Sequence, residues 1–497
     1  MTLYRSTRGA EHGLTASQAV LNGLAADGGL YVPETVPAFD FELKDLKGKS
    51  YKEIAGRVLR LWLSDYTDEE IAYAVDKAYS TFDCEEVAPM AYVDGAWYLE
   101  LFHGQTIAFK DVALSILPYL MTMAARKNGV TDKIVILTAT SGDTGKAAMA
   151  GFTDVPGTGI VVFYPEGGVS HIQELQMKTQ PGANVDAVAI KGNFDDAQTG
   201  VKKIFGDKAF RDELKKKGII LSSANSINIG RLVPQIVYYV VSYIRLLEGG
   251  KIGDGEKINI CVPTGNFGNI LAAFLAKEMG LPVAKLICAS NDNKVLYDFF
   301  RTGVYDRKRE FILTSSPSMD ILVSSNLERL IFLSCGCDAD RTASLMKSLS
   351  ESGSYEISDD MKAYIDGFCG GWASQDEVAA RIGDVYKKTG YVLDTHTAVG
   401  SCVYGKYARE TGDDTVSVIA STASPYKFAA DVVSGMTGEK KTDDADDWEI
   451  IGRLHEMSGL KIPAAVAGLK DAPLLHTDVC TIEDMPAQVM KSVEAFA

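Results

Sequence analysis

Residues 133–145, KIVILTATSGDTG, decide the fold class of this 497-residue chain. The continuous apolar run KIVILT leads into a turn rich in glycine and hydroxyl side chains, and a helix of small residues follows over 146–152. An apolar run without internal alternation predicts a strand that is buried on both faces, as in a parallel sheet covered by helices. Sheets of this kind bind ligands at the carboxyl ends of their strands, where this turn lies.

The same pattern recurs along the chain. Further apolar runs that predict strands occupy residues 159–164, 185–190, 257–262, 283–289 and 415–421. Helical patterns separate these runs, so we expect an α/β protein with open, largely parallel sheets. Before residue 92 the pattern is mostly helical, for example over 51–64 and 68–80.

Composition argues against several functional classes. A formal net charge of −16 disfavours general nucleic-acid binding, which needs a basic surface. The first residues contain no apolar signal segment, and no run of about 18 uncharged apolar residues occurs, so we expect neither secretion nor a membrane span. The eight cysteines and six histidines have no zinc-ligand spacing, which predicts a cytoplasmic protein without a structural metal.

The segment HGQTIAFKD, residues 103–111, places Lys110 between an apolar triplet and an apolar helical pattern over 112–123. An ammonium group in such surroundings has a large desolvation cost, so it must be neutralised, ion-paired or used covalently. One covalent use is an imine with the aldehyde of pyridoxal phosphate (PLP). The alternative is a lysine at a helix start whose stem lies on apolar surface while its head reaches water.

The turn over 138–145 is suited to an anion. The hydroxyl groups of Thr140, Ser141 and Thr144 open a helix, where a carboxylate or phosphate is favoured, although a capped helix start explains them equally well. The turn is not a nucleotide P-loop, because Thr140 replaces the first glycine and Ala147 replaces the magnesium-binding hydroxyl residue.

A second turn, PTGNFGN at 263–269, also follows a predicted strand. Gly265 and Gly268 allow the backbone to approach a phosphate, which amides at the next helix start can bind. The turn lacks the first glycine of a dinucleotide fingerprint, so a single phosphate fits better than a pyrophosphate.

Three more segments carry candidate ligand-binding side chains. In ANSINIGRL, residues 224–232, Asn225, Ser226 and Arg231 precede an apolar helix; they are suited to a phosphate, or are a helix cap and a surface arginine. Thr422 follows a strand and is placed to hydrogen-bond a ring nitrogen. His396, in DTHTAVG, either lines the same site or caps a helix, and we expect the structural role.

Taken together, these segments resemble the threonine synthase family, PLP enzymes of fold type II that are related to tryptophan synthase β-subunits and threonine dehydratase. YRSTRG at 4–9, GLAADGGLYVP at 23–33 and SHIQELQM at 170–177 extend the resemblance over nearly the whole chain. The sequence departs from the family pattern at Ala26, Gln105 and Thr395, each of which stands where the family usually has proline. These replacements affect loop rigidity rather than reacting groups.

The resemblance implies a domain organisation. An N-terminal domain of the threonine synthase type would cover residues 1–92, and the PLP-dependent catalytic region would cover 93–430. Within that region, a small mobile subdomain would span about 132–225 and a large subdomain the remainder. A C-terminal segment, 431–497, would pack on the large subdomain.

The resemblance also implies residue roles. Lys110 would bond covalently to PLP and later move protons. Asp143 would face the phenolic oxygen of PLP, and Thr422 its pyridine nitrogen. The cofactor phosphate would lie on Gly265, Asn266, Phe267, Gly268 and Asn269. The substrate carboxylate would be bound by Thr140, Ser141 and Thr144, and the substrate phosphate by Asn225, Ser226 and Arg231.

The implied reaction converts O-phospho-L-homoserine and water to L-threonine and phosphate by γ-elimination and β-addition, the last step of threonine biosynthesis. The alternative is a PLP-dependent phospho-lyase or dehydratase that releases a 2-oxo acid. A non-catalytic binding protein is disfavoured because Lys110 and both anion-binding turns are present. We expect a monomer or homodimer without a nucleic-acid or membrane partner.

Overall fold

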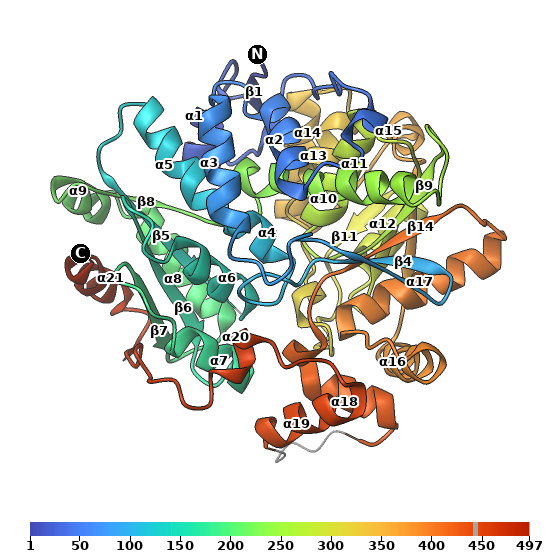
Figure 1. Ribbon diagram of the computed structural model, residues 1–497. Coiled ribbons are helices and arrows are strands. Elements are labelled where there is room, and N and C mark those ends of the chain that lie inside the picture. The colour runs from blue at the N-terminus through green and yellow to red at the C-terminus, as the bar shows by residue number, and fades with distance from the viewer. Residues whose placement is uncertain (141, 441–445, 497) are drawn as a thin grey trace.

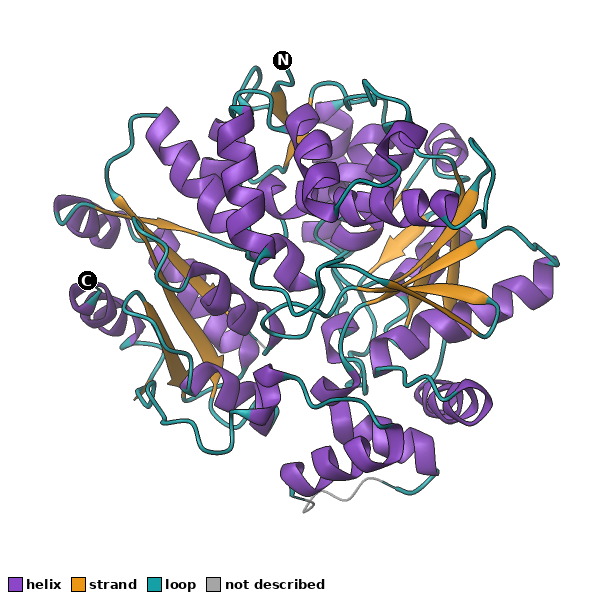
Figure 2. Cartoon of the chain, in the orientation of Figure 1, coloured by secondary structure: helices purple, strands orange, loops and turns teal. Residues whose placement is uncertain are grey.

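The computed structural model describes residues 1–140, 142–440 and 446–496, and two open sheets organise it (Figure 1). Figure 2 shows the strands of each sheet side by side, with helices packed around them. Within these two sheets, every neighbouring pair of described strands is parallel except one hairpin. The predicted α/β fold with open parallel sheets is confirmed.

The larger sheet has the strand order β13-β10-β9-β14-β4-β3. Its strands are β3 (Met90–Val93), β4 (Ala96–Glu100), β9 (Ile258–Pro263), β10 (Val283–Ser290), β13 (Phe368–Trp372) and β14 (Ser417–Ser421). The antiparallel pair, β3 and β4, lies at one edge. The apolar runs predicted as strands over 257–262, 283–289 and 415–421 are β9, β10 and β14.

Successive side chains of β9 enter cores on opposite faces of the larger sheet. Ile260 and Val262 are buried with residues of α11 and α12, whereas Cys261 is buried with residues of α17. The three helices are α11 (Gly268–Glu278), α12 (Val295–Thr302) and α17 (Thr395–Thr411). The long helix α10 (Ile229–Glu248) packs on α11. Burial on both faces explains why the strand is a continuous apolar run.

The smaller sheet has the order β15-β7-β6-β5-β8. Its strands are β5 (Lys133–Ala139), β6 (Thr158–Pro165), β7 (Val185–Ile190), β8 (Ile219–Ser222) and β15 (Val479–Cys480). The helices around it are α6 (Asp143–Phe152), α7 (His171–Lys178), α8 (Phe194–Gly206), α9 (Lys208–Lys216) and α21 (Met485–Ala495). Val135 and Leu137 of β5 pack with α8 and α21, and Ile134 and Ile136 pack on the other face with α6.

The C-terminal part of the chain joins both sheets, so the prediction that 431–497 packs on the large subdomain is wrong for its last part. α19 (Asp447–Ser458) does pack there, against α18 (Ala429–Thr437). β15, however, pairs in parallel with β7, and α21 packs on α8 (Figure 1). The physical reason is that β7 would otherwise be a sheet edge with unpaired peptide groups, and that the apolar side of α21 requires cover.

This arrangement predicts that the small sheet depends on α21. Met485 is fully buried in the core shared with α8, so Met485→Ala is expected to lower the free energy of unfolding by about 2–5 kcal/mol. Met485→Leu, which keeps the volume, should cost less than about 1.5 kcal/mol. Urea unfolding followed by circular dichroism measures both, and equal stability of the alanine variant and the parent would contradict the assignment.

The first part of the chain is mostly helical, as predicted. Its elements are β1 (Tyr4–Ser6), α1 (Ala16–Asn22), β2 (Tyr31–Pro33), η1 (Leu43–Leu46), α2 (Tyr51–Trp62) and α3 (Asp68–Tyr79). Reciprocal capping boxes begin α2, with Ser50 and Glu53, and α3, with Thr67 and Glu70. α2 packs on α10 and α1 packs on α5, so this part extends the same apolar core.

The apolar pattern over 112–123 forms two helices rather than one. They are α4 (Lys110–Leu114) and α5 (Leu117–Lys127). Pro118, in the first turn of α5, has no N–H to donate to the preceding turn, so a continuous helix would lack that bond. The backbone of α6 also approaches α4 closely, because a Cβ on Gly151 would lie 2.2 Å from the Leu114 carbonyl oxygen. Lys110 is therefore the first residue of a short helix.

The remaining elements complete the large subdomain and the C-terminal connection. They are β11 (Val304–Asp306), η2 (Pro317–Met319), α13 (Leu327–Ser334), α14 (Ala339–Ser352), β12 (Ser354–Glu356), α15 (Asp359–Tyr364), α16 (Gln375–Thr389), η3 (Pro425–Phe428) and α20 (Ala464–Ala467). No helix in the described part of the chain combines the length and apolarity needed to cross a membrane.

Candidate active site

Lys110 and Asp143 meet between the two sheets, each at the first residue of a helix. Lys110 begins α4, and Asp143 begins α6, directly after the turn that follows β5. Lys110 Nζ lies 3.4 Å from Asp143 Oδ2, and both side chains are largely buried, with 13% and 8% exposed. The predicted lysine thus faces the predicted aspartate rather than water, which excludes the reading in which its head reaches solvent.

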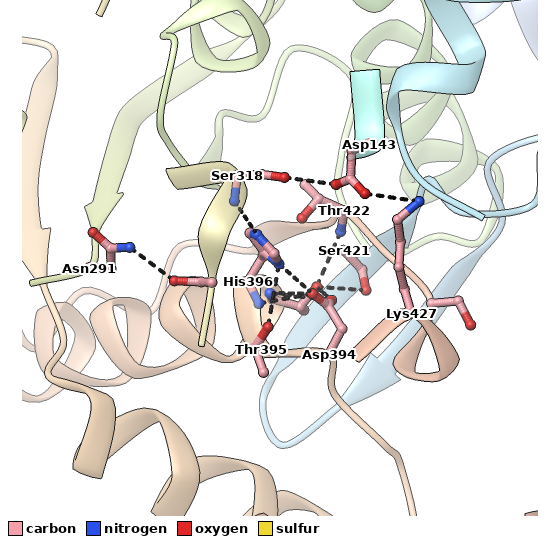
Figure 3. A network of polar contacts seen from close by, with 12 residues as sticks. Asp143, Asn291, Ser318, Asp394, Thr395, His396, Ser421, Thr422 and Lys427 are labelled. Carbon is pink, nitrogen blue, oxygen red and sulfur yellow. Dashed lines mark hydrogen bonds and ion pairs between the residues drawn. The ribbon is translucent and has the colours of Figure 1, made fainter. Parts of the chain in front are cut away.

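Asp143 makes polar contacts with several side chains, and Figure 3 shows those with Ser318 and Lys427. Its Oδ1 accepts a hydrogen bond from Gln173 Nε2 at 2.8 Å and forms an ion pair with Lys427 Nζ at 3.0 Å. Its Oδ2 accepts a hydrogen bond from Ser318 Oγ at 2.7 Å, besides facing Lys110. Gln173 and Asp143 belong to the helices of the small sheet, whereas Ser318 and Lys427 belong to the large subdomain. These contacts therefore hold the two subdomains together at the site.

Burial and neighbouring charges shift the pKa values of both central groups. Burial lowers the pKa of Lys110, Lys427 and Arg231 lower it further, and Asp143 opposes them. Burial alone would raise the pKa of Asp143, but Lys427, Lys110 and the hydrogen bond from Ser318 hold it well below its usual value. Asp143 therefore stays ionised, and Lys110 loses its proton more readily than an exposed lysine.

The backbone before Lys110 is held in an unusual conformation. Ile107 has φ 53, in the left-handed region that a β-branched residue rarely adopts. Contacts with the segment after β14 maintain it, since the Ser424 N–H donates to the Ile107 carbonyl at 3.0 Å and the Phe109 N–H donates to the Thr422 carbonyl at 2.9 Å. Strain of this kind persists only where the surroundings impose it, which is common at functional sites.

The turn between β9 and α11 has free backbone donors. Within the described residues, the N–H groups of Gly265, Asn266 and Phe267 donate to no acceptor, and the turn leads into the N-terminus of α11. The carbonyl groups of the same turn are engaged, because Ser324 Oγ donates to the Gly265 carbonyl at 2.6 Å and the Asn326 N–H donates to the Asn266 carbonyl at 3.2 Å. Free amides at a helix start are an anion site.

Two conformational features shape this turn. Phe267 adopts φ 67, which reverses the chain immediately before Gly268. Gly265 lies against the η2 turn so closely that a Cβ there would be 2.7 Å from the Ser318 carbonyl oxygen. A side chain at 265 would therefore displace the backbone that carries the Ser318 hydroxyl to Asp143.

Two buried side-chain donors in this region lack partners. Arg231 is 4% exposed, and its Nη1 donates to the Ala224 carbonyl at 2.8 Å, but its Nε has no acceptor. No carboxylate among the described residues pairs with Arg231, and burial lowers its pKa to about 10. Asn269 accepts from the hydroxyl groups of Tyr238 and Tyr239, while its Nδ2 donates to nothing. A buried cation and a buried amide that each keep a donor without an acceptor fit phosphate groups.

The residues predicted to bind the substrate carboxylate lie at the start of α6. Thr140 Oγ1 accepts hydrogen bonds from the N–H groups of Gly142 and Gly145, both at 3.0 Å, so this side chain shapes the turn. Thr144 is half-buried beside Asp143. Ser141 lies outside the described residues.

The three residues predicted to bind the substrate phosphate have different exposures. Arg231 is buried, Ser226 is half-buried and Asn225 is exposed. Ser226 Oγ accepts from Asn326 Nδ2 at 3.4 Å, and the backbone of Asn326 also binds the turn that holds Asn266. Asn326 thus links the two predicted anion sites.

Four residues of the site were given no role in the sequence interpretation, or only a structural one. Gln173 lies in the motif SHIQELQM, and Lys427 ends the segment STASPYK, residues 421–427, which carries Thr422, so the sequence indicates both segments but not the roles of these two residues. Ser318 lies in an irregular loop without a motif. His396 is buried, and its Nε2 accepts from the Ser318 N–H at 3.1 Å, which places its proton on Nδ1, 3.3 Å from Asp394 Oδ1 (Figure 3). The expected capping role is wrong, because Asp394 caps α17 by accepting from the His396 and Thr397 N–H groups, and His396 instead fixes the loop that reaches Asp143.

Comparisons with known proteins agree with this geometry. The family model "Threonine synthase N terminus" matches residues 3–79, and the model "Pyridoxal-phosphate dependent enzyme" matches residues 91–422. Threonine synthase of Saccharomyces cerevisiae is 36% identical over 470 residues, which cover 88% of this chain and 89% of the yeast protein. The crystal structure of PLP-bound threonine synthase from Brucella melitensis matches this structure with a TM-score of 0.88 and 37% identity, and the match covers both chains completely.

A second group of relatives is longer than this chain. Human threonine synthase-like 1 is 41% identical over 438 residues, which cover 84% of this chain. The matched part is only 58% of the length of the human protein. Because both family models match and the yeast enzyme is 36% identical over 88% of this chain, the chain belongs to the threonine synthase family of pyridoxal-phosphate-dependent enzymes.

Proposed function

We propose that this protein is a threonine synthase that converts O-phospho-L-homoserine and water to L-threonine and phosphate, with PLP bound through Lys110. The observation that carries the proposal is Arg231, a buried cation without a carboxylate partner among the described residues, close enough to lower the pKa of Lys110. The turn over 265–269 offers a separate anion site. The reaction requires two such sites, one for the cofactor phosphate and one for the substrate phosphate.

The residues present suit PLP. The free amides of Gly265, Asn266 and Phe267, with Gly268 and Asn269 at the start of α11, would hold its phosphate. Asp143 would face its phenolic oxygen and Thr422 its ring nitrogen. When bound, PLP supplies an electron sink that makes protons on neighbouring carbon atoms removable. The remaining work belongs to side chains of the protein.

Lys110 would move the protons at Cα and Cβ of the substrate. Its lowered pKa gives it a larger neutral fraction near pH 7 than an exposed lysine has, as a base requires. Arg231 would stabilise the negative charge that develops on the departing phosphate, and its planar fork fits two phosphate oxygens. Thr140, Ser141 and Thr144 would bind the substrate carboxylate near the N-terminus of α6. The contacts of Ser318 and Lys427 with Asp143 would close the subdomains and exclude water.

Product analysis tests this proposal. Purified protein with PLP and O-phosphohomoserine is expected to form threonine and phosphate in equal amounts, measured by amino-acid chromatography and a phosphate assay. The phospho-lyase alternative would instead give 2-oxobutyrate and ammonia with the phosphate. Release of 2-oxobutyrate without threonine would contradict the proposal.

We propose further that the protein acts in the cytoplasm as a monomer or homodimer. The net charge of −16 supports the absence of a nucleic-acid partner. No group of three or more histidine, cysteine, aspartate or glutamate side chains among the described residues could hold a metal ion.

A further inference from the structure

Lys427 is a buried lysine to which the proposed reaction assigns no proton transfer and no contact with substrate or cofactor. It lies in the η3 turn after β14, and only 1% of its side chain is exposed. Its Nζ donates to the Thr106 carbonyl at 2.9 Å and forms the ion pair with Asp143 Oδ1 at 3.0 Å. Burying an ammonium group is costly, so its partners must compensate for the lost hydration.

The two carboxylate oxygens of Asp143 face different cations. Oδ1 faces Lys427, and Oδ2 faces Lys110 at 3.4 Å and accepts from Ser318 at 2.7 Å. The contact with Lys427 is the shorter of the two ion pairs. Lys427 Nζ is also held by its hydrogen bond to the carbonyl of Thr106, which lies in the segment that precedes Lys110. One carboxylate thus lies between two lysines, and the lysine without a proposed covalent role is the closer one.

This division matters for the chemistry of Lys110. An amine attacks an aldehyde only in its neutral form, and an exclusive ion pair with Asp143 would retain its proton. We propose that Lys427 is a positioning residue, which neutralises Asp143 and thereby leaves Lys110 free to act as an uncharged amine. The inference depends on the proposed function only in taking Lys110 as the residue that bonds to the cofactor.

Titratable groups from five elements surround Lys110, Asp143 and Lys427. They are Lys110 and Asp111 on α4, Asp143 and Lys146 on α6, Arg231 on α10, His396 on α17 and Lys427 on η3. The directions of the shifts support the inference, since burial lowers the pKa of Lys110 and Lys427 lowers it further. Burial also lowers the pKa of Lys146 to about 7, so Lys146 is a second reporter of the local charge.

The test measures the charge of Lys110 in the protein without PLP. Competitive acetylation at a series of pH values, followed by peptide mass spectrometry, gives the pKa of each lysine. In Lys427→Met, the pKa of Lys110 is expected to rise, so that PLP bonds more slowly at pH 7.5, on the order of tenfold. Lys427→Arg, which keeps the charge, and Lys470→Met, at an exposed position, should leave the pKa of Lys110 near the parent value.

A double variant separates this role from a structural one. If Lys427 acts through Asp143, Asp143→Asn combined with Lys427→Met removes both charges and should return the pKa of Lys110 to the parent value or below. Circular dichroism identifies the variants that fold. If Lys427→Met does not fold, the double variant provides the test, because it has no unpaired buried carboxylate at this position. An unchanged titration of Lys110 in a folded Lys427→Met protein, or a raised pKa that persists in the double variant, would overturn the inference. These titrations report no product, so their failure is distinct from failure of the proposed reaction.

Discussion

Lys110→Ala is expected to lower kcat by at least about 10³-fold while the protein still folds. The variant loses both the covalent attachment of PLP and the base that would move the protons at Cα and Cβ. Folding should survive because the variant removes a buried ammonium group, while Asp143 keeps its ion pair with Lys427. The measurements are threonine formation under saturating substrate and the circular dichroism spectrum.

Attachment of PLP gives an independent check on Lys110. Borohydride reduction of the parent protein loaded with PLP, followed by peptide mapping, should place the cofactor on Lys110. Lys470→Ala, which changes an exposed lysine, serves as the matched control and should keep its activity. An adduct on another lysine, or activity of Lys110→Ala within tenfold of the parent, would refute the assignment.

Arg231→Met is expected to lower kcat/KM for O-phosphohomoserine by about 10²–10³-fold. The same change should raise the free energy of unfolding of the ligand-free protein, on the order of 1–3 kcal/mol, because a buried guanidinium without a carboxylate partner is costly. The loss of the hydrogen bond to the Ala224 carbonyl opposes this gain. Activity and stability thus move in opposite directions, which a general packing defect would not produce.

Inorganic phosphate and a lysine variant complete the test of Arg231. Phosphate should raise the Tm of the parent protein, because it binds the folded state, and should raise the Tm of Arg231→Met less. Arg231→Lys keeps the charge but lacks the planar fork, so it should recover only part of the activity. A destabilised Arg231→Met protein with normal kcat/KM would show that Arg231 has a structural role instead.

Local patterns predicted six strands of the two sheets, namely β5, β6, β7, β9, β10 and β14, but not β3, β4, β8 or β13. The apolar run over 185–190 is strand β7 without any change of bounds, because burial on both faces of a sheet leaves a signal in each residue. The two-residue strand β15 leaves no such signal, and its place depends on the free edge of β7, nearly 300 residues earlier in the chain. The break between α4 and α5 has a local cause in Pro118 and a tertiary one in the close approach of Gly151, and only the first is visible in the sequence.

The candidate site was predicted to a similar extent. Lys110 and Asp143 lie in recognisable motifs, and each begins a helix, so their meeting follows from the order of strands and helices. Ser318 could not be predicted, because it reaches Asp143 from an irregular loop held by His396 and by a glycine at 265. The role of Lys427 required the three-dimensional pairing, although its motif had been identified.

The late completion of the small sheet has a consequence for synthesis on the ribosome. β7 is made about 290 residues before β15, which at about 5–20 residues per second is a delay of roughly 15–60 s. During this interval the nascent chain carries an exposed strand edge and an uncovered apolar face on α8. Chaperones that bind extended apolar segments would therefore act mainly before β15 and α21 emerge, and slower translation of the second half of the chain would lengthen the period of aggregation risk.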